Sequence, residues 1–269
     1  RQSKTNNPVS GVTGVLCYSD GIFIQALEGG RAAVASASGM AAEAMALMTL
    51  LQQGDHVVAA GALYGGTVTM LAVNLAKFGI ETSFVDATKP EAFAAAMRPN
   101  TRAVFAESLG NPSLTVLDIA AVAEVAHAHG VPLVIDNTVP SPMLCNPIAL
   151  GADLVVHSTT KYINGHSDVV GGAVIANSKE LHEQLVWWTN ALGLTGSPFD
   201  SFLTLRGLRT LDARLRVHQE NAIGIAEQLQ AHPAVTAVHY PGLLSHPGHT
   251  LAARQQKGFG AMLSVEIAG

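Results

Sequence analysis

Residues Ala152–Asp168 read ADLVVHSTTKYINGHSD, and the interpretation of the rest of the chain follows from them. Leu154, Val155 and Val156 form a short apolar run, which is typical of a strand buried in a parallel sheet. The run ends in hydroxyls and a single amine, Lys161. Ligand sites of open α/β sheets lie at the carboxyl ends of strands, so this amine could form an imine with a carbonyl compound while the hydroxyls hold an anion. The alternative is an exposed lysine on a polar loop.

The composition favours a globular α/β protein with a large core. Of the 269 residues, 48% are hydrophobic and 13% are charged, which fits one large or two ordinary domains and excludes a disordered chain. The formal net charge of −5 argues against nucleic-acid or anionic-membrane partners. We expect no signal peptide and no membrane-spanning segment. Cys17 and Cys145 form no paired motif, so we expect a reducing, cytoplasmic location.

Strand and helix patterns alternate along the chain with short loops between them. This alternation indicates right-handed βαβ units on a mostly parallel sheet flanked by helices, the α/β class. The predicted strands are 32–37, 56–60, 81–85, 102–107, 132–135, 154–156, 235–240 and 262–267, and the predicted helices are 40–51, 67–78, 89–97 and 119–129.

Four of the predicted strands lead into chemically useful side chains. Tyr64 follows one strand, Glu107 and Asp136 end two others, and Lys161 follows the fourth. Because the carboxyl ends of parallel strands share one edge of a sheet, these groups are expected to converge. Each has an ordinary alternative: Asp136 as a turn cap, Tyr64 as a half-buried aromatic, and Asn111 before a proline as a turn residue.

A phosphate site is also indicated. Ser38-Gly39 separates a predicted strand from a predicted helix, and the free N–H groups of a helix N-terminus favour phosphate, although many such turns bind nothing. An amine, an acid, an aromatic face and an anion site are what pyridoxal 5′-phosphate (PLP) requires. We expect no metal site, because Glu124-x-x-His127 has no accompanying ligand motif. No Gly-x-Gly-x-x-Gly dinucleotide signature is present.

Residues 153–167 resemble the lysine signature of the Cys/Met-metabolism family of PLP enzymes. Residues 37–40 (ASGM), 63–66 (LYGG), 107–112 and 136–138 (DNT) support the resemblance and occur in the family's order. It implies PLP-dependent transferase fold type I, as in aspartate aminotransferase, with an incomplete C-terminal α/β domain. The implied organisation is an N-terminal arm at 1–30, a PLP-binding large domain at 31–209 and a partial C-terminal domain at 210–269.

The resemblance also assigns roles to individual residues. Lys161 would bind the cofactor and move protons, Tyr64 would stack on the ring and act as a base, and Asp136 would pair with the ring nitrogen. Asn111 would lie near the ring oxygen and the substrate carboxylate. The phosphate would be surrounded by Ser38, Gly39, Met40, Ser158 and Thr160.

Trp187-Trp188, 193–201 and 253–260 are most similar to the cystathionine γ-synthases of that family. The implied reaction is γ-replacement on an O-acylated homoserine by cysteine, in a homo-oligomer that is a tetramer built as a dimer of dimers. A sulfhydrylase, a cystathionine or methionine γ-lyase, and a non-catalytic remnant of the fold are the alternatives. The likeness predicts a chain truncated at both ends, without the family's substrate-carboxylate arginine.

The N-terminal residues depart from the family pattern. Residues 2–8 resemble the segment by which a neighbouring subunit reaches the phosphate, but Gln2 and Lys4 stand where the family has tyrosine and arginine. Lysine keeps the charge and loses the bidentate fork of arginine. Residues 9–26 have little likeness to the family, and no physical reason for this difference is evident in their sequence.

Overall fold

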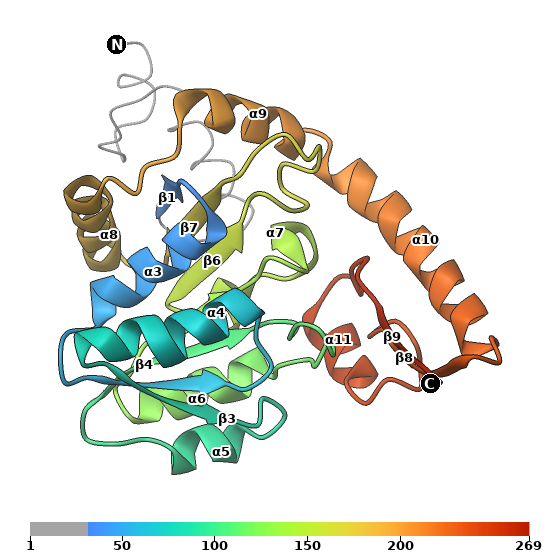
Figure 1. Ribbon diagram of the computed structural model, residues 1–269, viewed down its shortest axis with the longest axis horizontal. Helices are drawn as coiled ribbons and strands as arrows, with labels where there is room; N and C mark the ends of the chain where they lie inside the picture. Colours follow the sequence, from blue (N-terminus) through green and yellow to red (C-terminus); the bar gives the residue numbers. More distant parts are fainter. Residues whose placement is uncertain (1–31, 269) are drawn as a thin grey trace.

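The computed structural model describes residues 32–268, so the predicted arm at 1–30 lies outside the described residues. A seven-stranded sheet forms the centre of the molecule, and helices pack around it (Figure 1). Its strands are β1 (Ala32–Ser36), β2 (His56–Ala60), β3 (Glu81–Val85), β4 (Thr101–Glu107), β5 (Leu133–Asp136), β6 (Leu154–Ser158) and β7 (Gly172–Ala176).

The strand order is β1-β7-β6-β5-β4-β2-β3. Strands β2 to β6 pair in parallel, whereas β7 is antiparallel to both of its neighbours, β6 and β1. The sheet is therefore mostly parallel, as the sequence predicted. The antiparallel strand β7 was not predicted.

Helical segments connect the strands and continue the chain to its C-terminal part. They are α3 (Gly39–Leu50), α4 (Gly65–Thr69), the π-helical η1 (Met70–Asn74), the 3₁₀ helix η2 (Leu75–Phe78), α5 (Pro90–Ala95), α6 (Ile119–Ala128), α7 (Ser141–Leu144), the 3₁₀ helix η3 (Pro147–Leu150), α8 (Lys179–Leu192), α9 (Pro198–Leu208), α10 (Leu211–Gln230) and α11 (His249–Gln255). The helix predicted at 67–78 is thus helical throughout but changes its winding twice.

The main core lies around the central strands, whose apolar runs are covered on both faces. Every residue of β2 and β7 is buried, which is why these strands show no polar alternation. Helix α3, with its alanine, methionine and leucine side chains, contributes Met45 and Leu47, both with no exposed surface. This packing fixes the N-terminus of α3 at the edge of the sheet.

The C-terminal part forms a smaller unit around the far half of α10. Figure 1 shows α10 running along the outside of the molecule from α9 to the antiparallel pair β8 (Val235–His239) and β9 (Ser264–Ile267). Leu211 and Leu215 of α10 join the main core, whereas Ala222 and Ala226 pack with Tyr240 in a second cluster. The predicted boundary between residues 209 and 210 stays a prediction.

No helix within residues 32–268 combines the length and the apolar character needed to cross a membrane.

Candidate cofactor site

The carboxyl ends of β4, β5 and β6 lie at one edge of the sheet. Glu107 pairs in register with Asp136, and Asp136 pairs with Val156 of β6. Lys161 follows three residues after the end of β6, and Tyr64 follows β2, which is parallel to β4. The structure therefore brings the four side chains singled out from the sequence to the same edge.

The N-terminus of α3 packs directly against Ser158. A Cβ built on Gly39 would lie 2.6 Å from the Ser158 Cβ and 3.0 Å from its Cα, so a side chain at position 39 would force the helix away from β6. Ser38 caps the helix, because its Oγ accepts a hydrogen bond from the Ala41 N–H at 3.0 Å. The first-turn N–H groups and the helix dipole favour an anion beside Ser158.

The hydroxyl of Thr160 is hydrogen-bonded to the backbone of Gly171, the residue just before β7. Its Oγ1 donates to the Gly171 carbonyl oxygen at 3.2 Å and accepts from the Gly171 N–H at 3.0 Å. Its hydrogen is therefore directed at the protein rather than at an anion. Of the predicted phosphate residues, Ser38, Gly39, Met40 and Ser158 gather at the α3 N-terminus, and Thr160 braces the loop beside them.

The loop that carries Lys161 is held by an arginine from α10. Arg214 donates to the carbonyl oxygens of Tyr162 and Gly207, both at 2.8 Å, and lies against Gly165. Burial lowers the pKa of Arg214 from its ordinary value, and the side chain has carbonyl oxygens as its acceptors. The Lys161 side chain is exposed, and its amine forms no hydrogen bond or ion pair with the rest of residues 32–268.

Glu107 joins the loops that bear Tyr64 and Asn111. Its Oε1 accepts from the Tyr64 N–H at 2.6 Å, and its Oε2 accepts from the Asn111 N–H at 3.2 Å. Burial, followed by the charge of Asp136, raises the pKa of Glu107 to about 8. The Tyr64 ring is 52% exposed and crosses the start of α4, where a Cβ on Gly66 would lie 2.6 Å from the ring.

A third carboxyl, Glu43 of α3, completes the cluster. It is 3% exposed, and both of its oxygens lie within 3 Å of the Thr67 Oγ1, at 2.9 and 2.8 Å. It also shares a hydrogen bond with Asp136. Sequence reasoning missed Glu43, Thr67 and Arg214. For Glu43 a signal existed, because it is the lone charge in an otherwise apolar helix, GMAAEAMALMTL.

These residues fit PLP by the chemistry of their groups. Lys161 offers an amine that is unpaired within residues 32–268, Asp136 a half-buried carboxylate and Tyr64 an exposed aromatic face. The α3 N-terminus offers N–H groups suited to an anion, with Gly39 allowing its close approach to Ser158. Within residues 32–268 no group of three or more histidine, cysteine, aspartate or glutamate side chains is arranged to hold a metal.

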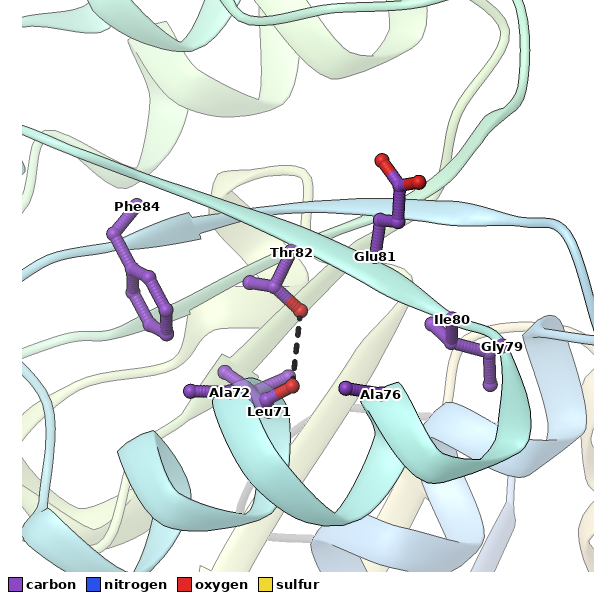
Figure 2. Close-up of a pocket in the computed structure, with 8 residues that line it drawn as sticks. All are labelled: Leu71, Ala72, Ala76, Gly79, Ile80, Glu81, Thr82 and Phe84. Carbon is purple, nitrogen blue, oxygen red and sulfur yellow. Dashed lines mark hydrogen bonds between the residues drawn. The ribbon is translucent and has the colours of Figure 1, made fainter.

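A hollow on the outer strand of the sheet lies apart from this site. Figure 2 shows it between β3 and the η1–η2 helical segment, where the Thr82 hydroxyl donates to the Leu71 carbonyl oxygen at 3.3 Å. Its lining combines apolar side chains with the polar side chains of Glu81 and Thr82. It contains no amine and no helix N-terminus, so it does not offer the groups gathered at the strand ends.

Comparison with known families gives two matches. The model described as Cys/Met metabolism PLP-dependent enzyme matches residues 22–269 and names the cofactor predicted from the residues. A second model, described as sensors of blue-light using FAD, matches residues 1–41. Residues 2–8, which resemble the family's phosphate-binding segment, lie outside the described residues. They also precede the part of the chain that the Cys/Met metabolism family matches.

The similar proteins are named as cystathionine γ-synthases or as γ-lyases. The probable cystathionine γ-synthase of Herpetosiphon aurantiacus is 46% identical over 91% of this chain and 77% of its own length. The cystathionine γ-lyase of Bacillus subtilis is 46% identical over 91% of this chain and 64% of its own length. A crystal structure of cystathionine γ-synthase from Xanthomonas oryzae pv. oryzae, in complex with aminoacrylate and cysteine, has a TM-score of 0.93 and 52% identity, and covers 96% of this chain and 66% of that one. The chain thus spans roughly two thirds of the length of most of these relatives.

Proposed function

Because this chain belongs to the Cys/Met metabolism family of PLP-dependent enzymes, we propose that it serves γ-replacement in sulfur amino-acid metabolism, joining an O-acylated homoserine to cysteine to give cystathionine. The observation that carries the proposal is the position of Lys161 at the carboxyl end of β6, beside the α3 N-terminus. The likeness to cystathionine γ-synthases at 46% to 52% identity supports the choice of reaction.

Each residue of the site has a task in this proposal. When bound, PLP supplies an electron sink for negative charge that develops next to the substrate amine. Lys161 holds the cofactor and then carries protons between substrate carbons. Tyr64 covers the ring and accepts a proton from the incoming amine, and Asp136 pairs with the ring nitrogen. Ser38, Gly39, Met40 and Ser158 hold the phosphate, with Thr160 supporting the loop, and Asn111 lies toward the substrate carboxylate.

A γ-lyase is the second candidate, because the cystathionine γ-lyase of Bacillus subtilis is 46% identical to this chain, as is the probable cystathionine γ-synthase of Herpetosiphon aurantiacus. The two reactions share the lysine and the cofactor and differ in whether a thiol adds after the γ-substituent leaves. Incubating the chain with PLP, cysteine and O-succinyl- or O-acetylhomoserine and measuring cystathionine and 2-oxobutanoate by mass spectrometry separates them. If the cofactor binds but neither cystathionine nor 2-oxobutanoate is formed, the result would favour a non-catalytic remnant.

The cofactor attachment has its own test. Borohydride treatment of the PLP-loaded chain followed by peptide mapping is expected to label Lys161. Lys161→Ala should lose the label and the visible absorbance, while Lys77→Ala, an exposed lysine away from the site, should keep both. A label elsewhere in the wild-type chain would refute the assignment.

Assembly and location are also part of the proposal. We propose a cytoplasmic homotetramer, built as a dimer of dimers. Exposed aromatic side chains on α8 and α9 support association, since Trp187 is 61% exposed and Phe199 is 66% exposed. Light scattering after size-exclusion chromatography tests this, and a monomer at micromolar concentration would count against it.

A further inference from the structure

Glu43 is a buried carboxyl that the proposed chemistry does not use. It lies near the start of α3, is 3% exposed, and has Thr67 and Asp136 as its polar neighbours. Burying an ionised carboxylate is costly unless it is paired with a positive charge, and neither neighbour supplies one. The site therefore favours a neutral Glu43.

The hydrogen bonds at Glu43 require that one of the two carboxyls, Glu43 or Asp136, carries a proton. The Thr67 hydroxyl has a single hydrogen to donate, and two carboxylates offer only acceptors to each other. A hydrogen bond between Glu43 and Asp136 therefore requires a proton between them. Glu43 is the more deeply buried of the two, which makes it the proton carrier and Asp136 the acceptor.

The charges around Glu43 act in the same direction. Burial first, and then the charge of Asp136 on β5, raise the pKa of Glu43, and the charge of Glu107 on β4 adds to them. The Thr67 hydrogen bond lowers the pKa, but the balance raises it to about 9. Among the described residues packed on α3, β1 and β7 carry no titratable side chain and β6 carries buried His157. The titratable side chains of α8 are Lys179, Glu180, His182 and Glu183.

We propose that Glu43 is a positioning residue for the cofactor ring, donating a hydrogen bond from its neutral carboxyl to Asp136 and so fixing the carboxylate that meets the ring nitrogen. The Thr138 N–H holds Asp136 Oδ1 at 2.8 Å, so the carboxylate is held by α3 and by its own strand end. The inference rests on the proposed role of Asp136. The hydrogen bond from Glu43 acts on the group that meets the ring nitrogen and does not involve the residues that hold the phosphate.

Two substitutions and two ligands test the proposal. Glu43→Leu removes the donor, whereas Glu43→Gln keeps a donor for Asp136 and an acceptor for Thr67. Glu124→Gln, on the exposed face of α6, is the matched control. Equilibrium dialysis of the full chain is performed with PLP and with its 1-deaza analogue, in which carbon replaces the ring nitrogen.

We expect Glu43→Leu to weaken PLP binding about 10- to 100-fold, the loss associated with one hydrogen bond to a charged group. The 1-deaza analogue lacks the nitrogen that Asp136 meets, so its affinity should change less than about 3-fold, within the usual error of such comparisons. Glu43→Gln and Glu124→Gln should bind PLP as wild type does.

Several results would overturn the proposal. An equal loss for both ligands in Glu43→Leu would indicate a general structural role, and no loss would remove the role altogether. Glu43→Gln as weak as Glu43→Leu would refute the donor. Wild-type chain that binds neither ligand would overturn the proposed function and this inference with it, whereas tight wild-type binding without loss in Glu43→Leu overturns this inference alone.

A measurement without ligand tests whether Glu43 is neutral in the folded chain. If Glu43 carries the proton, the unfolding midpoint of the cofactor-free wild type should fall more steeply between pH 5 and 9 than that of Glu43→Gln. The folded wild type must keep the Glu43 proton in addition to that of Glu107, whereas the variant keeps only the Glu107 proton. Identical pH profiles for the two proteins would contradict the neutral carboxyl.

Discussion

Replacing Gly39 with alanine is expected to weaken the fold and the phosphate site together. The new Cβ would lie 2.6 Å from the Ser158 Cβ, while ordinary contacts of this kind begin at 3.4 Å, so α3 and β6 must separate by about 0.8 Å. The atoms nearest the new Cβ include the Ser158 Cα, which is backbone and cannot turn aside as a flexible side chain would. Overpacking of this size costs about 1–3 kcal/mol of unfolding free energy.

That cost is measurable as a change in melting temperature. For a chain of this size each kcal/mol lowers the midpoint by about 2–4 °C, so Gly39→Ala should melt about 2–12 °C below wild type. The displaced helix N-terminus should also loosen PLP by about 10-fold or more, as expected when a hydrogen bond to a charged phosphate is lost. Circular dichroism melting without cofactor and equilibrium dialysis with PLP measure the two effects.

Gly224→Ala is the matched control for this substitution. Gly224 lies within α10, and no atom of residues 32–268 approaches within 4 Å of the place where its Cβ would be. Alanine there should stabilise the chain by about 0.5–1 kcal/mol through helix propensity alone. Equal melting temperatures for Gly39→Ala and Gly224→Ala, together with PLP binding as tight as in the wild type, would refute the close contact between α3 and Ser158.

Two further predictions concern stability. Arg214→Ala should lower the unfolding free energy by about 1–3 kcal/mol in urea titrations, because the carbonyls of Tyr162 and Gly207 lose a charged donor. Arg214→Lys should not restore the stability, since lysine lacks the planar fork. An alanine variant as stable as the wild type would refute this role of Arg214. Burial raises the pKa of Glu43 to about 9 and that of Glu107 to about 8, above their ordinary 4.5. As the pH rises, the unfolded chain therefore releases these two protons at a lower pH than the folded chain does. The unfolding free energy of the cofactor-free chain should therefore fall as pH rises from about 5 to 8, by up to about 1.4 kcal/mol per pH unit for each carboxyl, and a flat profile in denaturant titrations would contradict it.

The parallel strands could be predicted because their sequences carry their own signal. β2 and β5 are continuous apolar runs closed by a turn residue or an acid, and such runs suit strands covered on both faces. The strand ends then indicated Tyr64, Glu107, Asp136 and Lys161, and the structure places them at one edge. The local pattern was sufficient for these residues, because parallel strands all have their carboxyl ends at the same edge of the sheet.

Contacts between elements distant in sequence could not be predicted in this way. The sequence indicated Thr160 through its place beside Lys161, but its hydroxyl bonds Gly171, which belongs to a loop whose path depends on β7. Glu43 reaches Asp136 across 93 positions of the sequence, through the packing of α3 on the sheet. No local periodicity carries information about partners at that separation.

The phosphate end of the site depends on the strand that the sequence did not reveal. β1 pairs antiparallel with β7, and β7 pairs antiparallel with β6, so two reversals leave β1 running parallel to β6. Ser36 and Ser158 consequently both pair with Gly172, one on each side. The carboxyl end of β1 therefore lies at the same edge as that of β6, and α3, which begins three residues after β1, must start beside Ser158. Without β7 between them, the helix N-terminus that we propose to hold the phosphate and the loop of Lys161 would have no structural reason to meet.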